Sequence, residues 1–370
     1  MSQVHRQQLA FSLDQPPTPA SFPVDSIAPL PGLQLLRRPG VNIQSPMSRL
    51  APTLRHLARR RFGAAPAAAP AAGRVHSVHT LPRSERRPMH STPAQSNLNP
   101  TTRPHLLPEF SLKDKVIVVS GGARGLGLVQ AEALLEAGAT VHCIDRLPSP
   151  ANDPASGFSE ISKRARRDLD TSLTYHQTDV RNVGELNKIM ENIADQAGRL
   201  DGLIAAAGIN HETPALEYTS DEVDRMMSIN VTGAFMTAQA AARQMVRLKQ
   251  PGSICLIASM SGTIANRGMY APAYNASKAA VIQLCRSLAA EWGEYGIRVN
   301  TLSPGYIMTQ MLQSLFDDYP ERKEVWPKEN MLKRLSLPSE YRGSAVFLLS
   351  DASSFMTGSD LRIDGGHAAW

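Results

Sequence analysis

The chain has 370 residues, a hydrophobic content of 42% and a formal net charge of +6 at pH 7. That length and apolar content suffice for one large or two ordinary domains with a buried core. Residues 1–110 contain 13 Arg, no Lys and four acidic residues, a net charge of +9, so the remaining residues carry −3. A mildly acidic remainder without zinc-finger spacing or a basic aromatic patch argues against nucleic-acid binding.

Residues 1–110 are rich in Pro, Ala, Ser and Arg and show no sustained apolar period. We therefore expect a disordered N-terminal region and one folded domain at 111–370, where apolar segments alternate with glycine-containing turns. No stretch reaches the roughly 18 uninterrupted apolar residues that a transmembrane helix needs, so no stable membrane insertion is expected.

The segment that begins at Met47 has the composition of a mitochondrial transit peptide. It contains many Arg, Ala and Ser and has no acidic residue before Glu85, as is typical of such presequences. This pattern predicts a mitochondrial protein in which residues 1–46 are an upstream extension. The alternative is a cytoplasmic protein with a disordered tail.

The first apolar run of the predicted domain, 115–120 (KVIVVS), leads into GGARGLG and then into the helical pattern LVQAEALLEAG. A strand, a glycine turn and a helix in this order present backbone N–H groups to a dinucleotide pyrophosphate. The structural alternative is a tight turn without a ligand. The candidate cofactor-binding residues of this turn are Gly121, Arg124, Gly125, Leu126 and Gly127.

The next predicted strand, 140–144 (TVHCI), ends at Asp145. A carboxylate at this distance from the glycine turn can accept hydrogen bonds from both hydroxyls of the adenosine ribose, which favours NAD. Arg124 and Arg146 favour NADP instead, because each could pair with a 2′-phosphate. We favour NAD, since a carboxylate facing the ribose would repel that phosphate.

Further strands are predicted at 175–180 (YHQTDV) and 200–206 (LDGLIAA). Asp179 and Val180 are candidates for contacts with the adenine. Because strands and helices alternate along the chain, we expect an α/β fold of the Rossmann type. Its parallel β-sheet would be doubly wound, with helices on both faces and the ligand beyond the carboxyl ends of the strands.

The strongest catalytic pattern follows the predicted strand 253–258 (SICLIA). Ser259 comes directly after this strand, and Tyr274 and Lys278 follow in PAYNASKAA at the start of a long apolar helix. An i, i+4 spacing places the phenol and the ammonium on one helical face. A neighbouring ammonium lowers the pKa of a phenol toward the range useful for acid–base catalysis.

The combination of SGGARGLG, SINVTGAF, the serine after a strand, YNASK and IRVNTLSPGY resembles the short-chain dehydrogenase/reductase family over 111–370. The resemblance implies that Tyr274 is the general acid/base, and that Lys278 lowers its pKa and binds the nicotinamide ribose. It also implies that Ser259 polarises the reacting oxygen and that Asn230 holds a water of the proton relay. The Ser259–Tyr274 separation is slightly longer than is usual in the family.

The same resemblance implies further cofactor contacts after two other strands. The positions concerned are Ala207, Gly208, Pro304, Gly305, Ile307 and Thr309. The chain departs from the family pattern before Gly208, where it has three alanines in place of Asn-Asn-Ala. That departure removes amide hydrogen bonds from the central sheet but removes no catalytic group.

The stretches IASMSGTIANRG and PAYNASKAAVIQLCRSLAAEWGEYGIRVNTLSPGYI are most similar to fungal polyol and ketose members, the arabinitol, mannitol, sorbose and xylulose dehydrogenases. The resemblance implies an NAD(P)-dependent interconversion of a sugar alcohol such as D-arabinitol and a ketose. The alternatives are a reductase of a larger ketone in secondary or lipid metabolism and a non-catalytic dinucleotide-binding protein. No metal is expected, because no His, Cys and carboxylate cluster stands out in the sequence.

Substrate specificity is predicted to depend on residues 307–330, where the family places its substrate lid. The side chains that would line a polyol pocket are His211, Asn266, Tyr306 and Trp326. The apolar C-terminal tail ends in Trp370 and is expected to be buried at a subunit interface. Because related proteins are commonly tetramers, we expect a homotetramer.

Overall fold

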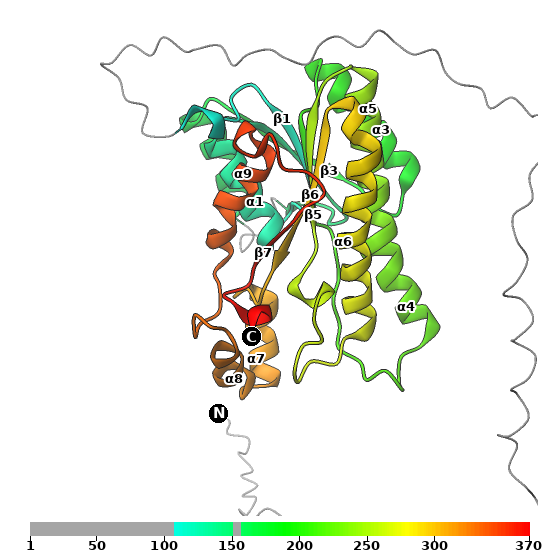
Figure 1. The fold of residues 1–370 in the computed structure, drawn as a ribbon. Coiled ribbons are helices and arrows are strands. Elements are labelled where there is room, and N and C mark those ends of the chain that lie inside the picture. The colour runs from blue at the N-terminus through cyan, green and yellow to red at the C-terminus, as the bar shows by residue number, and fades with distance from the viewer. Residues whose placement is uncertain (1–106, 151–156) are drawn as a thin grey trace, which may run out of the picture. The chain divides into compact units, whose positions relative to one another are not determined.

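A computed structural model of the protein describes residues 107–150 and 157–370. These residues form one sheet of seven parallel strands in the order β3-β2-β1-β4-β5-β6-β7 (Figure 1). The strands are β1 Val116–Ser120, β2 Thr140–Asp145, β3 Leu173–Gln177, β4 Gly202–Ala205, β5 Gly252–Ile257, β6 Ile297–Pro304 and β7 Asp360–Ile363. The predicted doubly wound parallel sheet is confirmed.

Helices cover both faces of this sheet (Figure 1). They are α1 Gly125–Glu136, α2 Phe158–Asp168, α3 Val183–Ala197, α4 Ser220–Met227, α5 Ala234–Arg247, α6 Pro272–Trp292, α7 Gln310–Asp318, α8 Arg322–Glu329 and α9 Arg342–Leu349. One core cluster includes Leu186 of α3 and Val281 of α6, and the other includes Leu134 of α1 and Leu348 of α9. Because both faces are buried, β1 reads as a continuous apolar run and is buried at every residue.

The order of the strands reverses at β1. This strand pairs with β2 on one side and with β4 on the other, so that Ser120 aligns with both Ile144 and Ala205. In doubly wound sheets, ligands bind beyond the carboxyl ends of the strands at such a reversal. The glycine turn follows β1, Asp145 ends β2, and Ala207 and Gly208 follow β4, so all three candidate segments meet at this edge.

One predicted strand is shifted relative to the structure. The strand expected at 175–180 is β3, which ends at Gln177. After Thr178 the backbone turns, because the carboxylate of Asp179 accepts the N–H of Arg181 and its carbonyl accepts the N–H of Asn182. Asp179 therefore lies in a turn beyond the strand.

The described part of the chain begins before the predicted domain boundary at 111. Pro108–Phe110 form a short 3-10 turn, and the ring of Phe110 lies 6.3 Å from that of Phe347 on α9. The predicted transit peptide lies outside the described residues. Within 107–150 and 157–370, no helix has the length and apolar character needed to cross a membrane.

Candidate active site

Tyr274 and Lys278 lie on the first two turns of α6. Their spacing places Lys278 Nζ 5.6 Å from the centroid of the Tyr274 ring. Lys278 is 6% exposed, and its Nζ donates a hydrogen bond of 2.8 Å to the carbonyl of Ile257, the last residue of β5. This bond holds the ammonium beside the phenol.

Ser259 lies just beyond β5 and contacts the same phenol. Its hydroxyl is hydrogen-bonded to Tyr274 and also accepts the N–H of Ser261 at 3.2 Å. Ser261 thus contributes a backbone donor that orients the Ser259 side chain. The structure brings Ser259, Tyr274 and Lys278 into one cluster.

Opposing effects act on the ionisation of Tyr274. Burial raises the pKa of Tyr274 above its ordinary value, and the hydrogen bond with Ser259 lowers it in part. Burial also lowers the pKa of Lys278 to about 8. The net shift of the phenol is therefore opposite to the one expected from a neighbouring ammonium alone, because desolvation disfavours the phenolate.

Asn230 lies in a π-helical turn, Ser228–Gly233, between α4 and α5. Its amide accepts the N–H of Ile209 and donates to the carbonyl of the same residue, both at 2.9 Å. The amide also donates to the hydroxyl of Ser277 at 3.0 Å. Asn230 therefore ties the segment after β4 to the catalytic helix. Ser277, inside YNASK, is a contact that sequence reasoning did not single out.

The glycine turn leaves its backbone unusually accessible on one side. Gly121 has a φ of +68°, and a Cβ there would lie 2.8 Å from the backbone nitrogen of Ala207, so only glycine fits. A Cβ on Gly127 would lie 2.3 Å from the carbonyl oxygen of Gly121. At Gly125, by contrast, no atom lies within 4 Å of the Cβ position. The turn is tightly packed against the protein but open at Gly125.

The start of α1 fits a pyrophosphate. No side chain in the described part of the chain caps this helix at Arg124, so its first N–H groups can bind an anion. Leu126, in the first turn of the helix, is partly buried. The residues at this edge therefore fit a dinucleotide, whose phosphates would be bound by the first N–H groups of α1 beside Gly125.

Asp145 contacts the glycine turn directly. Its carboxylate accepts the N–H groups of Ala123 and Leu147, each at 3.3 Å. Arg124 and Arg146 are exposed, and neither forms a salt bridge within 107–150 and 157–370. This turn therefore lies beside both the carboxylate expected to bind the ribose and the two arginines expected to bind a 2′-phosphate.

Asp179 and Val180 face in different directions. The Asp179 carboxylate is paired with Arg181 at 2.6 Å, and this hydrogen bonding lowers the pKa of Asp179. Val180 is 6% exposed and packs into the core, where a Cβ on Gly233 would lie 2.6 Å from its Cγ2. Of the side chains of Asp179 and Val180, only that of Asp179 is available to an adenine.

The remaining predicted cofactor contacts follow β4 and β6. A Cβ on Gly208 would lie 3.7 Å from Lys278 Nζ, so the segment of Ala207 and Gly208 adjoins the catalytic lysine. Thr309 caps α7, since its hydroxyl accepts the N–H of Leu312 at 3.3 Å. That hydroxyl retains a proton that it can donate to a carboxamide.

The other predicted cofactor contacts of this set lie at the end of β6 and directly after it. Pro304 ends β6, and the N–H of Gly305 donates to the carbonyl of Ile363 at 2.9 Å. Ile307 forms an isolated parallel bridge with Ser336. These bonds fix the path of the chain from the sheet into residues 307–330, which we call the lid segment.

Aromatic residues of the lid segment pack beside Tyr306 and Tyr274. Trp326 of α8 is 3% exposed and stacks on Tyr306, with ring centroids 4.1 Å apart and planes 9° apart. Phe316 of α7 meets Trp326 edge-on at 5.9 Å. Phe316 and Trp326 form a small core with Met269 and Ala271, and both Tyr274 and Tyr306 pack against this core.

Three of the four residues predicted to line a polyol pocket lie together. Asn266 is 6% exposed and donates to the hydroxyl of Tyr306 at 3.4 Å, and its Oδ1 has no partner in the described part of the chain. Burial raises the pKa of Tyr306 to about 12. His211 instead packs on Tyr218, with ring centroids 5.3 Å apart. The cluster thus contains Asn266, Tyr306 and Trp326.

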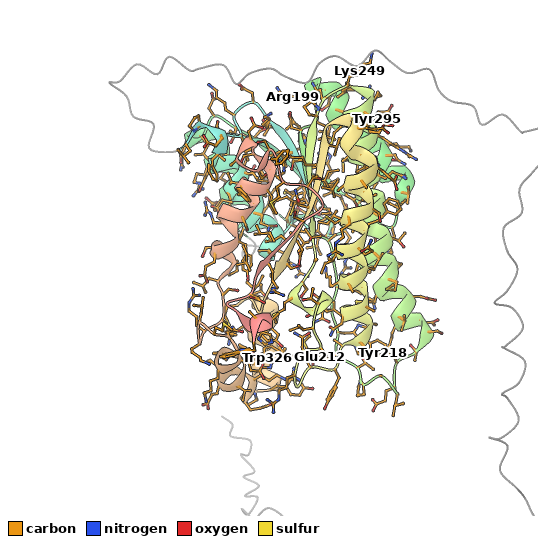
Figure 2. The ribbon with its side chains drawn as sticks, viewed as in Figure 1. Arg199, Glu212, Tyr218, Lys249, Tyr295 and Trp326 are labelled. Carbon is orange, nitrogen blue, oxygen red and sulfur yellow. The ribbon has the colours of Figure 1, made fainter. Side chains whose placement is uncertain are left out.

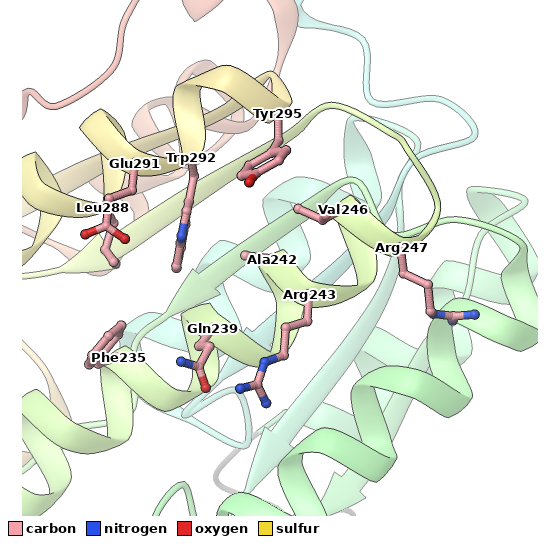
Figure 3. Close-up of a pocket in the computed structure, with 10 residues that line it drawn as sticks. All are labelled: Phe235, Gln239, Ala242, Arg243, Val246, Arg247, Leu288, Glu291, Trp292 and Tyr295. Atoms are coloured by element: carbon pink, nitrogen blue, oxygen red, sulfur yellow. The ribbon is translucent and has the colours of Figure 1, made fainter. Parts of the chain in front are cut away.

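Among the described residues, no group of three His, Cys, Asp or Glu side chains is suited to a metal ion. A groove of about 470 Å³ runs between α5 and α6 and is lined by residues that include Phe235, Val246, Trp292 and Tyr295 (Figure 3). None of the candidate catalytic residues lines this groove, so it is distinct from the site at Tyr274.

Comparison with known proteins places the chain in a family. A family model described as Enoyl-(Acyl carrier protein) reductase matches residues 121–368. The chain is 40% identical over 266 residues to the short chain dehydrogenases/reductase notP' of Aspergillus versicolor, a match that covers 70% of this chain and 89% of the relative. It is 37% identical over 272 residues to a ribulose-forming D-arabinitol 2-dehydrogenase of Candida tropicalis, with 72% and 96% covered.

Among solved structures, the fold is similar to that of a gluconate 5-dehydrogenase from Burkholderia cenocepacia in complex with NADP and tartrate. The two share 31% sequence identity and a TM-score of 0.64, over 71% of this chain and 98% of the other. The matched region contains the glycine turn, Ser259, Tyr274 and Lys278. The chain therefore belongs to the short-chain dehydrogenase/reductase family and is an NAD(P)-dependent dehydrogenase acting on CH–OH groups.

Proposed function

We propose that the protein interconverts a sugar alcohol, such as D-arabinitol, and the corresponding ketose. The observation that carries the reaction type is the convergence of the Ser259 hydroxyl, which follows β5, with the Tyr274 phenol and the Lys278 ammonium of α6. The substrate class is supported by the similarity to D-arabinitol 2-dehydrogenase and by the polar Asn266 and Tyr306 beside the cluster.

Each residue of the cluster has a separate task in this proposal. The nicotinamide, when bound, supplies or accepts a hydride. Tyr274 donates its proton to the carbonyl oxygen during reduction and accepts it during oxidation, while the Ser259 hydroxyl donates a hydrogen bond that polarises the same oxygen. Lys278 Nζ donates one of its three N–H groups to the carbonyl of Ile257, so the other two N–H groups can bind the ribose hydroxyls.

Asn230 would act on this cluster indirectly, through the backbone and through Ser277. Its amide is hydrogen-bonded to Ile209 and Ser277. We therefore propose that Asn230 fixes the position of the π-helical turn relative to α6. A water of the proton relay would then be held by the backbone carbonyl groups near this turn. Unlike Tyr274, Asn230 is thus a positioning residue.

We propose that NAD is preferred over NADP. The Asp145 carboxylate already accepts two backbone N–H groups and would place a negative charge against a 2′-phosphate. The exposed Arg124 and Arg146 and the NADP in a related crystal structure favour the other cofactor. Equilibrium titration with NADH and NADPH decides this point: tighter binding of NADPH would contradict the proposal, and equal binding would remove the role of Asp145 in discrimination.

A second candidate substrate is a larger, more apolar ketone. It is favoured by the aromatic cluster of Phe316, Trp326 and Tyr306 against Tyr274. A turnover assay with a panel of pentitols, hexitols, ketoses and bulky ketones distinguishes the two. Turnover of polyols at the highest kcat/KM supports the first candidate, and turnover of bulky ketones alone would replace it with the second.

We further propose import into mitochondria and assembly into a homotetramer. Import is supported by the Arg-rich, acid-poor sequence that begins at Met47. Fractionation of cells, together with N-terminal sequencing of the native protein, tests it. A cytoplasmic protein that retains residues 1–46 would contradict the proposal.

A further inference from the structure

A partly buried ion pair joins the lid segment to the body of the protein. Arg322, the first residue of α8, donates from both terminal nitrogens to the two carboxylate oxygens of Glu212, at 2.7 and 2.9 Å. The two side chains are only 13% and 22% exposed. Bidentate pairs of this kind are geometrically specific, and partial burial reduces screening by solvent.

The pair connects two segments that lie at the same end of the molecule. Glu212 follows β4, and Figure 2 shows its label next to that of Trp326, which lies on α8 with Arg322. The Arg322 side chain also donates to the carbonyl of Gly268, in the loop after β5, at 3.4 Å. One guanidinium therefore reaches the segments after β4 and after β5 from the lid segment.

The same guanidinium braces the aromatic cluster of the lid segment. It lies 4.3 Å from the centroid of Tyr319 and 5.2 Å from that of Trp326. Trp326 stacks on Tyr306 and belongs to the small core against which Tyr274 is packed. Displacement of Arg322 would thus free the residues that cover the catalytic tyrosine.

The two loops that receive Arg322 are themselves joined. The N–H of Thr213 donates to the carbonyl of Tyr270 at 2.8 Å, so the segment after β4 is fixed to the segment that leads into α6. Ala271 precedes this helix, and Tyr274 lies in its first turn. The ion pair therefore anchors the lid segment to the same backbone that carries the catalytic phenol.

We propose that Glu212 and Arg322 are positioning residues that hold the lid segment over Tyr274 and so determine how tightly the substrate is bound. The inference rests on the proposed oxidoreductase function, because the lid covers the residues assigned to proton transfer. Since neither residue reaches the phenol directly, loss of the pair should weaken substrate binding far more than it slows the chemical step.

The test compares Glu212→Gln with the unmodified full-length protein. Glu212→Asp is the conservative variant, and Asp195→Asn is the matched control, because Asp195 forms an ion pair of 2.5 Å with Arg247 between α3 and α5, away from the lid segment. Two quantities are measured: steady-state kinetics on the best substrate of the panel, and hydrogen–deuterium exchange of residues 310–329.

For Glu212→Gln we expect KM to rise about tenfold, kcat to stay within about twofold, and exchange in 310–329 to accelerate about tenfold, while β1 stays protected. Glu212→Asp should give intermediate values and Asp195→Asn the values of the unmodified protein. Unchanged lid exchange, unchanged KM, or faster exchange throughout the sheet would each overturn the inference. If the unmodified protein turns over no panel member, the proposed function fails, and lid exchange alone decides whether the pair holds the lid.

Discussion

The Tyr274 hydroxyl is subject to two opposing influences, of which burial is the larger. Its pKa is raised by burial and lowered in part by Ser259. Oxidation of an alcohol requires the phenolate, whereas reduction of a ketone requires the phenol. We therefore expect kcat/KM for oxidation to rise with pH into the alkaline range, and kcat/KM for reduction to stay constant through neutral pH and fall in the alkaline range.

Substitution of Ser259 tests the cause of this profile. Ser259→Ala removes the hydrogen bond that lowers the pKa of Tyr274, so both alkaline limbs should move to higher pH and the rate should fall by about 100-fold. Ser261→Ala is the matched control, because Ser261 contributes its backbone N–H rather than its side chain. If the alkaline limbs of the pH profiles lie at the same pH in Ser259→Ala as in the unmodified protein, Ser259 does not lower the pKa of Tyr274.

Helix α1 carries an unsatisfied amide. Gln130 is fully buried, and neither of its side-chain polar atoms has a partner in the described part of the chain. Replacing it with the apolar Leu should raise the free energy of unfolding by about 1 kcal/mol, because a buried unpaired amide is costly. Urea denaturation measures this change. Gln244→Leu is the control, since Gln244 on α5 accepts a hydrogen bond from Arg247 and its loss should not stabilise the fold.

Strands β2 and β3 carry a pair of histidines. The Nδ1 of His142 lies 2.9 Å from the Nε2 of His176, and burial lowers the pKa of His142 from 6.5 to about 4 and that of His176 as well. The unfolded chain thus takes up protons first as the pH falls. The free energy of unfolding should decrease by about 1–2 kcal/mol between about pH 7 and about pH 5 on account of this pair.

Denaturation curves at the two pH values check this expectation. In His142→Gln the neighbouring His176 keeps a hydrogen-bonding partner. The variant lacks the imidazole whose pKa is lowered by burial, so the free energy of unfolding should decrease less in acid than it does in the unmodified protein. An equal loss in the variant and the unmodified protein would assign the acid sensitivity to other groups.

At the scale of the whole molecule, the groove between α5 and α6 exposes apolar side chains, of which Val246 is 38% exposed. A second candidate contact surface is the C-terminal Trp370, which is 77% exposed and whose indole N–H donates to the carbonyl of Glu329. Its expected burial at a subunit interface stays a prediction. For the proposed homotetramer, light scattering should give a mass about four times the monomer mass. Val246→Glu should shift it downward while Lys188→Glu on α3 does not, and a monomer at micromolar concentration would contradict the assembly.

Local patterns predicted the fold and the catalytic cluster well. The buried run of β1, the glycines after it and the i, i+4 spacing of Tyr274 and Lys278 each depend on neighbours in the sequence, so periodicity and turn chemistry were sufficient. The Glu212–Arg322 pair joins positions 110 residues apart and lies in no motif. Likewise, the direction of the Tyr274 pKa shift depends on burial in three dimensions, which spacing alone does not report.

The central claim is that Tyr274 transfers the proton while the dinucleotide is held by other residues. Its most direct test is a comparison of turnover and cofactor dissociation constants in the unmodified protein and in Tyr274→Phe. The account predicts a loss of kcat of about 1,000-fold or more, with the dissociation constant of the reduced cofactor changed by less than about threefold. Retention of a tenth or more of the activity by Tyr274→Phe would contradict it.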